Sequence, residues 1–397
     1  MRFFNTAGPV NCAEHYCLPP LGRLDLNEIL RLIRQKKYFV LHAPRQAGKT
    51  TYLLALQDYL NQTGEYRCVY FNVEVAQSAR EDVQWSVQAI LSEMAFQAKV
   101  SLNDAYVEST WSEILDQSGG HAAFGKVLAL WSQQSDKPLI LLIDEIDSLV
   151  GDTLIAVLRQ LRAGYAHRPT AFPQSVVLCG VRDVRDYRLY SGDGKAVITG
   201  GSAFNIKATS LRLGNFKPDE VKILYQQHTG ETGQIFEAGV IDLVWDLTRG
   251  QPWLVNALGY EACFELEAGR DRTGLITVEM MIAAKERLIE RRETHLDQLV
   301  DKLREERVRR VIEPILSSSA SPHLIPDDDI LYVQDLGLIE TEGQLRIANP
   351  IYQEIIPRQL TFSTQRTISY EPAWYIAPDG RLELEKLLVA FQNVFLK

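Results

Sequence analysis

The sequence lacks the features of a membrane or secreted protein. No stretch approaches the roughly 18 consecutive apolar residues that a membrane-spanning helix needs. Residues 1–10 do not form a cleavable signal peptide, which requires a basic start followed by an apolar run. We therefore expect a cytoplasmic protein with no membrane partner.

Cysteines are few and acidic residues outnumber basic ones. The five cysteines have no regular spacing, so we expect reduced thiols rather than a disulfide framework. A metal site at Cys12 and Cys17, with His15 between them, is disfavoured because no second ligand pair follows. The 42 basic and 51 acidic residues give a net charge of −9. The net charge therefore does not support nucleic acid as a partner, although a single basic face on an acidic protein would still allow nucleic acid to bind.

The chain is too long for one compact core. Its 397 residues predict two to three domains. An apolar content of 46% and a charged content of 23% are typical of a globular protein.

Residues 38–51, YFVLHAPRQAGKTT, predict a phosphate-binding loop between an apolar strand and an amphipathic helix. Ala43 stands where such loops usually have their first glycine. Gly48 allows backbone N–H groups to approach phosphate oxygens, and the start of the helix adds a positive dipole end. Lys49 is expected to reach the terminal phosphates and the Thr50 hydroxyl to hold Mg²⁺. The predicted nucleotide contacts are Ala43, Pro44, Arg45, Gln46, Ala47, Gly48, Lys49, Thr50 and Thr51.

A pair of acidic residues follows a later strand. A second strand is predicted at 66–73, and about sixty residues of helical pattern come next, too long for a loop, with aromatic residues such as Trp85 that we expect in the core. Residues 138–144 are apolar on both faces, as in a central parallel strand. Asp144 at its end is expected to hold Mg²⁺, and Glu145 to take a proton from the attacking water. The alternative is that both acids only cap the following helix.

Several arginines are candidates for contact with the γ-phosphate. Arg182 follows the strand predicted at 175–180 and is the first candidate. Arg185 and Arg188 would act on this chain's nucleotide or on that of a neighbouring copy. The sequence does not decide among these and Arg159 or Arg162 on the preceding helix. A fifth strand is predicted at 208–213.

The chain after residue 215 is expected to form helical and mixed regions. The predicted domains are a P-loop ATPase domain at 1–215 with an adenine-side N-terminal segment, a helical lid at 216–295, a winged-helix-like domain at 296–365, and a C-terminal tail and helix at 366–397. Arg23 is either an adenine-side contact or an ordinary surface arginine. Pro252, after Gly250, either lies against the base or only turns a helix corner. The winged-helix-like domain lacks a basic recognition helix, so we expect it to pack on other domains rather than on DNA.

The chain resembles the AAA+-like signal-transduction ATPases with numerous domains, the STAND class. The resemblance rests on four features in this order: the phosphate loop, Leu142-Ile143-Asp144-Glu145, Arg182 and Gly250-Gln251-Pro252-Trp253. The likeness covers residues 20–360. It implies an α/β P-loop NTPase fold of the ASCE type, with a parallel sheet and a helical insertion, and ATP or ADP with Mg²⁺ as cofactors. Leu21-Gly22-Arg23 is similar to that group's hydrophobic-Gly-Arg-Glu segment but has Leu24 in place of Glu, and residues 250–252 look like its Gly-x-Pro lid motif.

The two ends of the chain carry a further resemblance. Residues 1–11 and 378–392 look like parts of a set of uncharacterised bacterial ATP-binding proteins. In that set the second segment leads into a restriction-endonuclease-like domain, which we expect to be absent here.

These patterns predict an ATP-binding switch of the signalling or defence type that hydrolyses ATP slowly. Its expected partners are a nucleotide and either another protein or further copies of the chain. A DNA-dependent AAA+-type motor or loader, and a DNA-binding regulator with a structural nucleotide, remain as alternatives.

Overall fold

A computed structural model describes residues 1–182, 188–190, 197–199, 205–291, 301–317, 325–341 and 343–358, with positions 296, 299, 381–384, 386 and 388. Its centre is a five-stranded parallel sheet in the order β2-β3-β4-β1-β7. The strands are β1 (Tyr38–His42), β2 (Arg67–Asn72), β3 (Leu139–Asp144), β4 (Ser175–Gly180) and β7 (Lys207–Arg212). A separate antiparallel pair comprises β5 (Arg188–Tyr190) and β6 (Val197–Thr199).

The sheet confirms the predicted parallel P-loop architecture. Every residue of β3 and β4 is buried, because central parallel strands are covered on both faces. β4 lies between β1 and β3, with Val177 opposite Phe39 on one side and Leu142 on the other. All five strands of this sheet point the same way, so the residues that follow β1, β3 and β4 meet at one edge.

Helices cover both faces of the sheet. The helices α1 (Leu26–Arg34) and α2 (Lys49–Thr63) share a buried apolar cluster with one face. The other face packs against α3 (Val83–Leu102), α4 (Tyr106–Ser118), α5 (Gly120–Gln134) and α6 (Gly151–Gly164). Short 3-10 turns lie at Pro20–Arg23, Val73–Ala79, Ile146–Ser148 and Tyr165–His167. The helical insertion predicted between the second and third strands is thus confirmed as α3, α4 and α5.

One prediction for this insertion is wrong. Trp85 is 63% exposed instead of lying in the core, whereas Trp131 of α5 is fully buried. Trp85 stands in the first turn of α3, on the side away from Val83, Val87 and the other residues that face the sheet.

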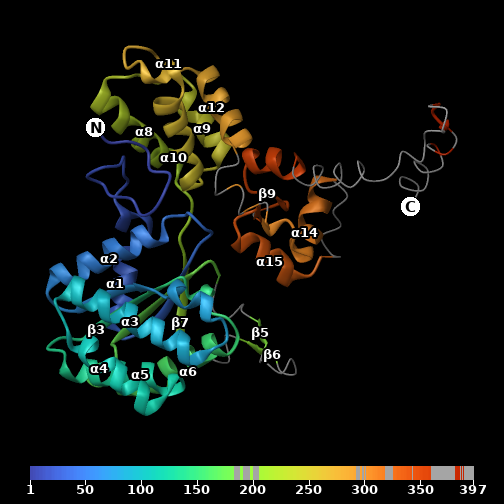
Figure 1. Ribbon diagram of the computed structural model, residues 1–397. Helices are drawn as coiled ribbons and strands as arrows, with labels where there is room; N and C mark the ends of the chain where they lie inside the picture. Colours follow the sequence, from blue (N-terminus) through green and yellow to red (C-terminus); the bar gives the residue numbers. More distant parts are fainter. Residues whose placement is uncertain are drawn as a thin grey trace.

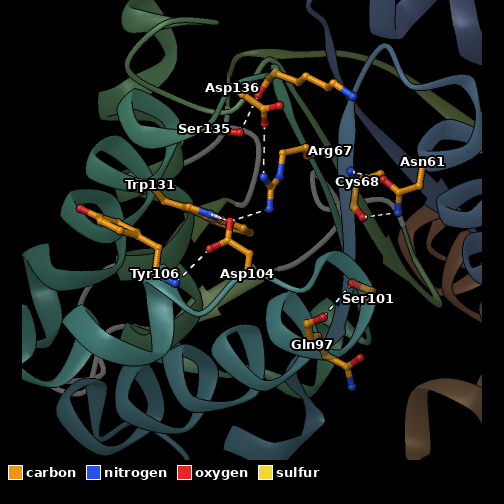
Figure 2. Close-up of polar contacts among 11 residues, drawn as sticks. Asn61, Arg67, Cys68, Gln97, Ser101, Asp104, Tyr106, Trp131, Ser135 and Asp136 are labelled. Atoms are coloured by element: carbon orange, nitrogen blue, oxygen red, sulfur yellow. Dashed lines mark hydrogen bonds and ion pairs between the residues drawn. The ribbon is translucent and has the colours of Figure 1, made fainter.

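A polar network ties the insertion to the edge of the sheet (Figure 2). Arg67 of β2 forms ion pairs with Asp104, at 2.7 Å, and with Asp136, at 3.2 Å. Asp104 also accepts hydrogen bonds from the Trp131 indole (2.8 Å) and from the Tyr106 backbone N–H (2.9 Å). One carboxylate therefore joins β2, the corner between α3 and α4, and α5.

The next part of the chain is helical, and Figure 1 shows it above the sheet. It comprises α8 (Pro218–Thr232), α9 (Val240–Thr248), α10 (Pro252–Tyr260) with a π-helical turn at Glu261–Glu265, α11 (Glu267–Arg270) and α12 (Val278–Arg291). The predicted break between α9 and α10 is confirmed. Gly250 has a positive φ of 72°, and Pro252 is the first residue of α10, where its missing N–H costs nothing.

Two helices and a hairpin follow, beside the helical region in Figure 1. They are α14 (Glu306–Leu316), α15 (Asp327–Asp335) and the antiparallel strands β8 (Ile339–Glu340) and β9 (Arg346–Ile347). Their buried residues join one apolar cluster with those of α8–α12. We call residues 301–358 the C-terminal region. The predicted C-terminal helix lies mostly outside the described residues.

The first residues pack on the helical region, where Figure 1 places the N-terminus beside α8. Phe4 and Tyr16 are buried, and the Phe4 ring centroid lies 4.9 Å from that of Tyr16 and 4.9 Å from that of Tyr225 of α8. The Trp253 indole donates a hydrogen bond to the Thr6 carbonyl (2.8 Å). The N-terminal segment, residues 1–18, is therefore held by α8 and α10.

The prediction of five reduced thiols is wrong for one pair. Cys12 and Cys17 form a disulfide with Cα atoms 5.2 Å apart. A turn brings them together, because the Glu14 and His15 N–H groups both bond to the Asn11 carbonyl. The other three cysteines are buried free thiols, as predicted: Cys68, Cys179 and Cys263. In the described part of the chain, no helix is both long enough and apolar enough to cross a membrane.

Candidate nucleotide site

The loop between β1 and α2 has the backbone of an anion cradle. Gln46 and Gly48 both have positive φ values, 56° and 90°, which turn the chain sharply before α2 begins at Lys49. The free N–H groups at the start of α2 therefore face the loop. The Lys49 ammonium folds back and donates to the carbonyls of Ala43 (3.1 Å) and Pro44 (3.2 Å). These acceptors are neutral, so a phosphate would be a stronger partner for the ammonium.

Asp144 lies directly against this loop. The Thr50 hydroxyl donates to Asp144 Oδ2 at 2.8 Å, and the Tyr70 hydroxyl donates to the same oxygen at 3.1 Å. Asp144 Oδ1 accepts the Glu145 backbone N–H at 2.9 Å. The Asp144 carboxylate is fully buried. Burial of Tyr70 itself, together with the negative charge of Asp144, raises the pKa of Tyr70.

The Thr50 and Asp144 oxygens fit a magnesium ion. Mg²⁺ prefers hard oxygen ligands and is usually held by one or two protein groups, with phosphate and water completing the shell. Among the described residues there is no cluster of three or more histidine, cysteine or acidic side chains that would form an all-protein metal cage. The Thr50 hydroxyl and the Asp144 carboxylate, beside a phosphate loop, match the one or two protein ligands that Mg²⁺ usually has.

Glu145 follows the last residue of β3. Its φ of 54° turns the chain at the end of β3. Burial raises its pKa, the nearby charges of Asp147 and Asp144 raise it further, and Lys49 and Arg45 oppose the shift. A carboxylate with a raised pKa is a better base than an ordinary one, since proton affinity rises with pKa.

Arg182 faces the C-terminal region in this structure. Its Nε pairs with Asp335 of α15 at 3.3 Å, and its guanidinium lies 4.9 Å from the centre of the Tyr332 ring. The strand before it is held by Asp147, which accepts the Val181 N–H at 3.1 Å. The described contacts of Arg182 are thus with α15.

Arg23 connects three parts of the chain. Its guanidinium donates to the Ala47 carbonyl (3.4 Å) and to the Gly214 carbonyl, and lies 4.6 Å from the centre of the Phe216 ring. Burial lowers its pKa to about 10. It is therefore not an ordinary surface arginine, because it links the phosphate loop to the segment that leads into α8.

A cavity of about 130 Å³ lies on one side of the loop, and we call it the N-terminal cavity. Its lining comes from the N-terminal segment, the start of α2 and α10, and includes residues 5–8, Arg23, Gly48, Thr51, Pro252 and Trp253. The Val10 N–H bonds to the Thr51 hydroxyl at 3.0 Å and closes the cavity toward α2. Arg23 and Pro252 thus share one cavity next to the phosphate loop.

Two of the other predicted arginines, Arg159 and Arg162, lie apart from this group. Arg159 and Arg162 are on the exposed face of α6. Arg185 and the side chain of Arg188 lie outside the described residues. Tyr70, Asp147 and Asp335 were not predicted, since their roles come from contacts between distant segments. Of these three residues, Asp147 alone stands close in sequence to a predicted site residue, three positions after Asp144, and that position could have indicated a role at the site.

The fold is that of known ATPases. A Walker-type ATPase from Pyrococcus abyssi aligns with 89% of this chain and 99% of its own, with a TM-score of 0.59 and 15% identity, which shows a shared fold. Weaker likenesses are to the Aeropyrum pernix ORC1 protein in complex with DNA (TM-score 0.44, 14% identity, 91% and 96% of the chains) and to the Thermotoga maritima RuvB Holliday junction branch migration motor (TM-score 0.41, 12% identity, 84% and 95%).

No curated protein matches the chain. The family described as AAA-like domain matches residues 25–356, a span that runs from the start of α1 through the hairpin of the C-terminal region. The chain belongs to this AAA-like domain family.

Proposed function

We propose that the chain binds ATP or ADP with Mg²⁺ at the phosphate loop, hydrolyses ATP slowly, and acts as a molecular switch of the signalling or defence type. The observation that carries this proposal is the meeting of Lys49, Thr50, Asp144 and Glu145 at one edge of the sheet. The hydrogen bond from Thr50 to Asp144 joins the start of α2, which follows β1, to the end of β3, a strand that does not neighbour β1, and supports a preformed site.

Each residue has a distinct role in the proposed reaction. Lys49 and the N–H groups of the loop hold the phosphates, and Thr50 with Asp144 would hold Mg²⁺. When bound, the ion neutralises charge on the phosphates. Glu145 orients a water molecule and takes its proton, for which its raised pKa is suited. Positioning and charge account for most of such catalysis, so slow turnover is expected without a further arginine.

The switch proposal rests on three contacts between the loop edge and the end of α15. Arg182 pairs with Asp335, and Arg212 at the end of β7 donates to the Gln334 carbonyl at 3.2 Å. A Cβ atom on Gly337 would lie 2.7 Å from Cγ of Pro44, so this turn rests directly on the phosphate loop. We propose that α8–α12 act as a lid, that the C-terminal region acts as a winged-helix domain, and that nucleotide state controls their contact. A γ-phosphate would then compete with Asp335 for Arg182.

The ATPase proposal is tested with Glu145→Gln and Lys49→Ala. Loss of the general base should lower the ATPase rate by about 100-fold or more while ATP still binds, because base catalysis contributes that much. Lys49→Ala should lose nucleotide binding. Glu290→Gln, on the exposed side of α12, is the matched control and should behave like the wild type. A wild-type chain that binds no nucleotide, or a Glu145→Gln variant with a normal rate, contradicts the proposal.

A DNA-dependent motor and a DNA-binding regulator are less well supported. The first turn of α15 carries Asp327, Asp328 and Asp329, which would repel the phosphates of DNA. Arg307 and Arg310 of α14 are already paired with Asp329. ATPase stimulation by DNA with a steep salt dependence would favour the motor, and duplex binding that survives Lys49→Ala would favour the regulator.

A further inference from the structure

A second and larger cavity lies on the opposite side of the phosphate loop. Its volume is about 710 Å³, within the usual range for small-molecule sites. We call it the junction cavity, because its wall comes from several elements: the phosphate loop, the ends of β4 and β7, the end of α9 and the C-terminal region. No residue lines both this cavity and the N-terminal cavity, and Ala47 and Gly48 face different ones.

The wall of the junction cavity is basic although the protein is acidic. It contains five basic side chains and only two acidic ones, Asp301 and Glu340. Glu340 pairs with Arg346, one of these five bases, at 2.7 Å, and Asp301 pairs with Arg304 at 3.4 Å. Arg249 and Lys302 pair with Asp246 and Glu305 outside the wall, which leaves Arg45 and Arg212. The cavity therefore has an excess of positive charge in a molecule whose net charge is −9.

In the described part of the chain, two of the lining guanidinium groups have no carboxylate within ion-pair distance. Arg45 forms no ion pair with a described carboxylate, although its charge opposes the raised pKa of Glu145, and the described hydrogen bond of Arg212 is to the neutral Gln334 carbonyl. Such groups in a concave site attract phosphate, because guanidinium and phosphate form short, charge-assisted hydrogen bonds. Arg45 and Arg212 come from the phosphate loop and from β7, so one ligand would contact both elements.

The rest of the wall suits a small organic molecule. Trp245 and Tyr352 present aromatic surface, and the amides of Asn215, Gln251 and Asn349 offer both donors and acceptors. Aromatic surface together with converging polar groups is typical of ligand sites.

We propose that the junction cavity binds a small phosphorylated molecule in addition to the nucleotide at the phosphate loop. The ligand would join the phosphate loop and β7 to the C-terminal region through Arg45, Arg212 and the β8–β9 hairpin. Its binding does not depend on ATP hydrolysis. Its effect, to hold the C-terminal region against the loop, rests on the proposed switch.

The test uses inorganic pyrophosphate as the probe and the full chain saturated with ADP. Calorimetric titration without Mg²⁺ should show one bound pyrophosphate, and a fluorescent ADP analogue should stay bound during the titration. Arg212→Gln should weaken pyrophosphate binding by about tenfold or more, the effect of removing one charge-assisted hydrogen bond. Glutamine can still donate to the Gln334 carbonyl, so an unchanged melting temperature separates loss of binding from loss of folding.

Two further variants decide the interpretation. Arg309→Gln, which removes an exposed arginine of α14 outside the cavity, should bind pyrophosphate like the wild type. Lys49→Ala should lose ADP but still bind pyrophosphate in the junction cavity, so this arm reports on the cavity even if the proposed function fails. Displacement of ADP by pyrophosphate, equal affinity in Arg212→Gln, or loss of pyrophosphate binding in Lys49→Ala would each overturn the inference.

Discussion

Asp144 receives hydrogen bonds from three separate parts of the chain. They come from the Thr50 hydroxyl, the Tyr70 hydroxyl and the Glu145 backbone N–H. The carboxylate is fully buried, so these bonds fix its orientation without competition from water. A site residue held in this way needs little rearrangement when a ligand arrives, which is the condition for electrostatic catalysis.

Gly250 is the residue at which a small change should have a large effect. A Cβ atom there would lie 2.0 Å from the Phe216 carbonyl oxygen, and the φ of 72° is unfavourable for other residues. Gly250→Ala should lower the free energy of unfolding by about 2 kcal/mol or more, through strain and a broken contact. Thermal or urea unfolding measures the change.

Gly214→Ala is the matched control for that variant. Gly214 lies in the connection between β7 and α8, two residues before the Phe216 against which Gly250 packs, but a Cβ atom on Gly214 would meet nothing within 4 Å. Its stability should change by less than about 0.5 kcal/mol, or rise slightly. Equal stabilities of the two variants would contradict the role given to Gly250.

At the scale of elements, the Arg67 network should hold the helical insertion on the sheet. Arg67→Met would keep the packing of the side-chain stem but leave Asp104 without its cation. We expect a loss of about 1–3 kcal/mol in the free energy of unfolding, the usual cost of removing a charged partner from a partly buried group. Asp136→Asn is the control, since this partner is 69% exposed and should matter little. A larger loss in Asp136→Asn than in Arg67→Met would refute this account.

The docking of the N-terminal segment should depend on pH through His228 of α8. Its Nδ1 contacts the Tyr16 hydroxyl at 3.1 Å and its Nε2 contacts Gln234 Oε1 at 2.8 Å. Burial lowers the His228 pKa below the ordinary value of 6.5, Arg272 lowers it further, and Gln234 and Glu231 oppose the shift. Docking of the segment therefore favours the neutral form of the ring.

The sign of the pH effect follows from this shift. Well above pH 6.5 the ring is neutral in both states, so its protonation does not affect docking. Below that pH the released state binds a proton more readily than the docked state, so docking weakens as the pH falls toward the lowered pKa. Amide hydrogen exchange of Phe3 and Tyr16, whose N–H groups bond to the Glu14 and Phe3 carbonyls, should accelerate beyond the intrinsic pH trend. His228→Gln should remove the effect, and persistence of the pH dependence in that variant would rule out this histidine.

At the scale of the whole molecule, the pair between Arg182 and Asp335 is expected to restrain the C-terminal region. Both side chains are less than 15% exposed, so the pair is screened little by solvent. Asp335→Asn should weaken the contact with the sheet edge and raise the rate of ADP release by about tenfold, equivalent to about 1.4 kcal/mol. Stopped-flow release of a fluorescent ADP analogue measures this rate.

Small-angle scattering of the same variant should show a larger radius of gyration. Asp246→Asn is the control, because it removes an exposed pair with Arg249 within α9 and its following turn. Unchanged ADP release and unchanged dimensions in Asp335→Asn would show that this pair does not restrain the region.

Local patterns predicted much of the fold and of the site. The apolar strands, Gly48 before Lys49, and Asp144 at the end of a buried strand are all short-range features, and the structure has the predicted strands in parallel order. Trp85 was wrongly assigned to the core because a helical pattern does not reveal which face meets the sheet. The bond between Cys12 and Cys17 was missed because it depends on a turn at Asn11.

The sequence by itself determined the phosphate loop, the acids that follow β3, and the break between α9 and α10, since each depends on a few adjacent residues and their backbone preferences. Tertiary structure alone decided that Tyr70 bonds to Asp144, that Arg182 pairs with Asp335, and that a basic cavity lies where the loop meets the C-terminal region. These features join residues from 74 to more than 150 positions apart. Their distances are set by the packing of whole elements, which no local pattern records.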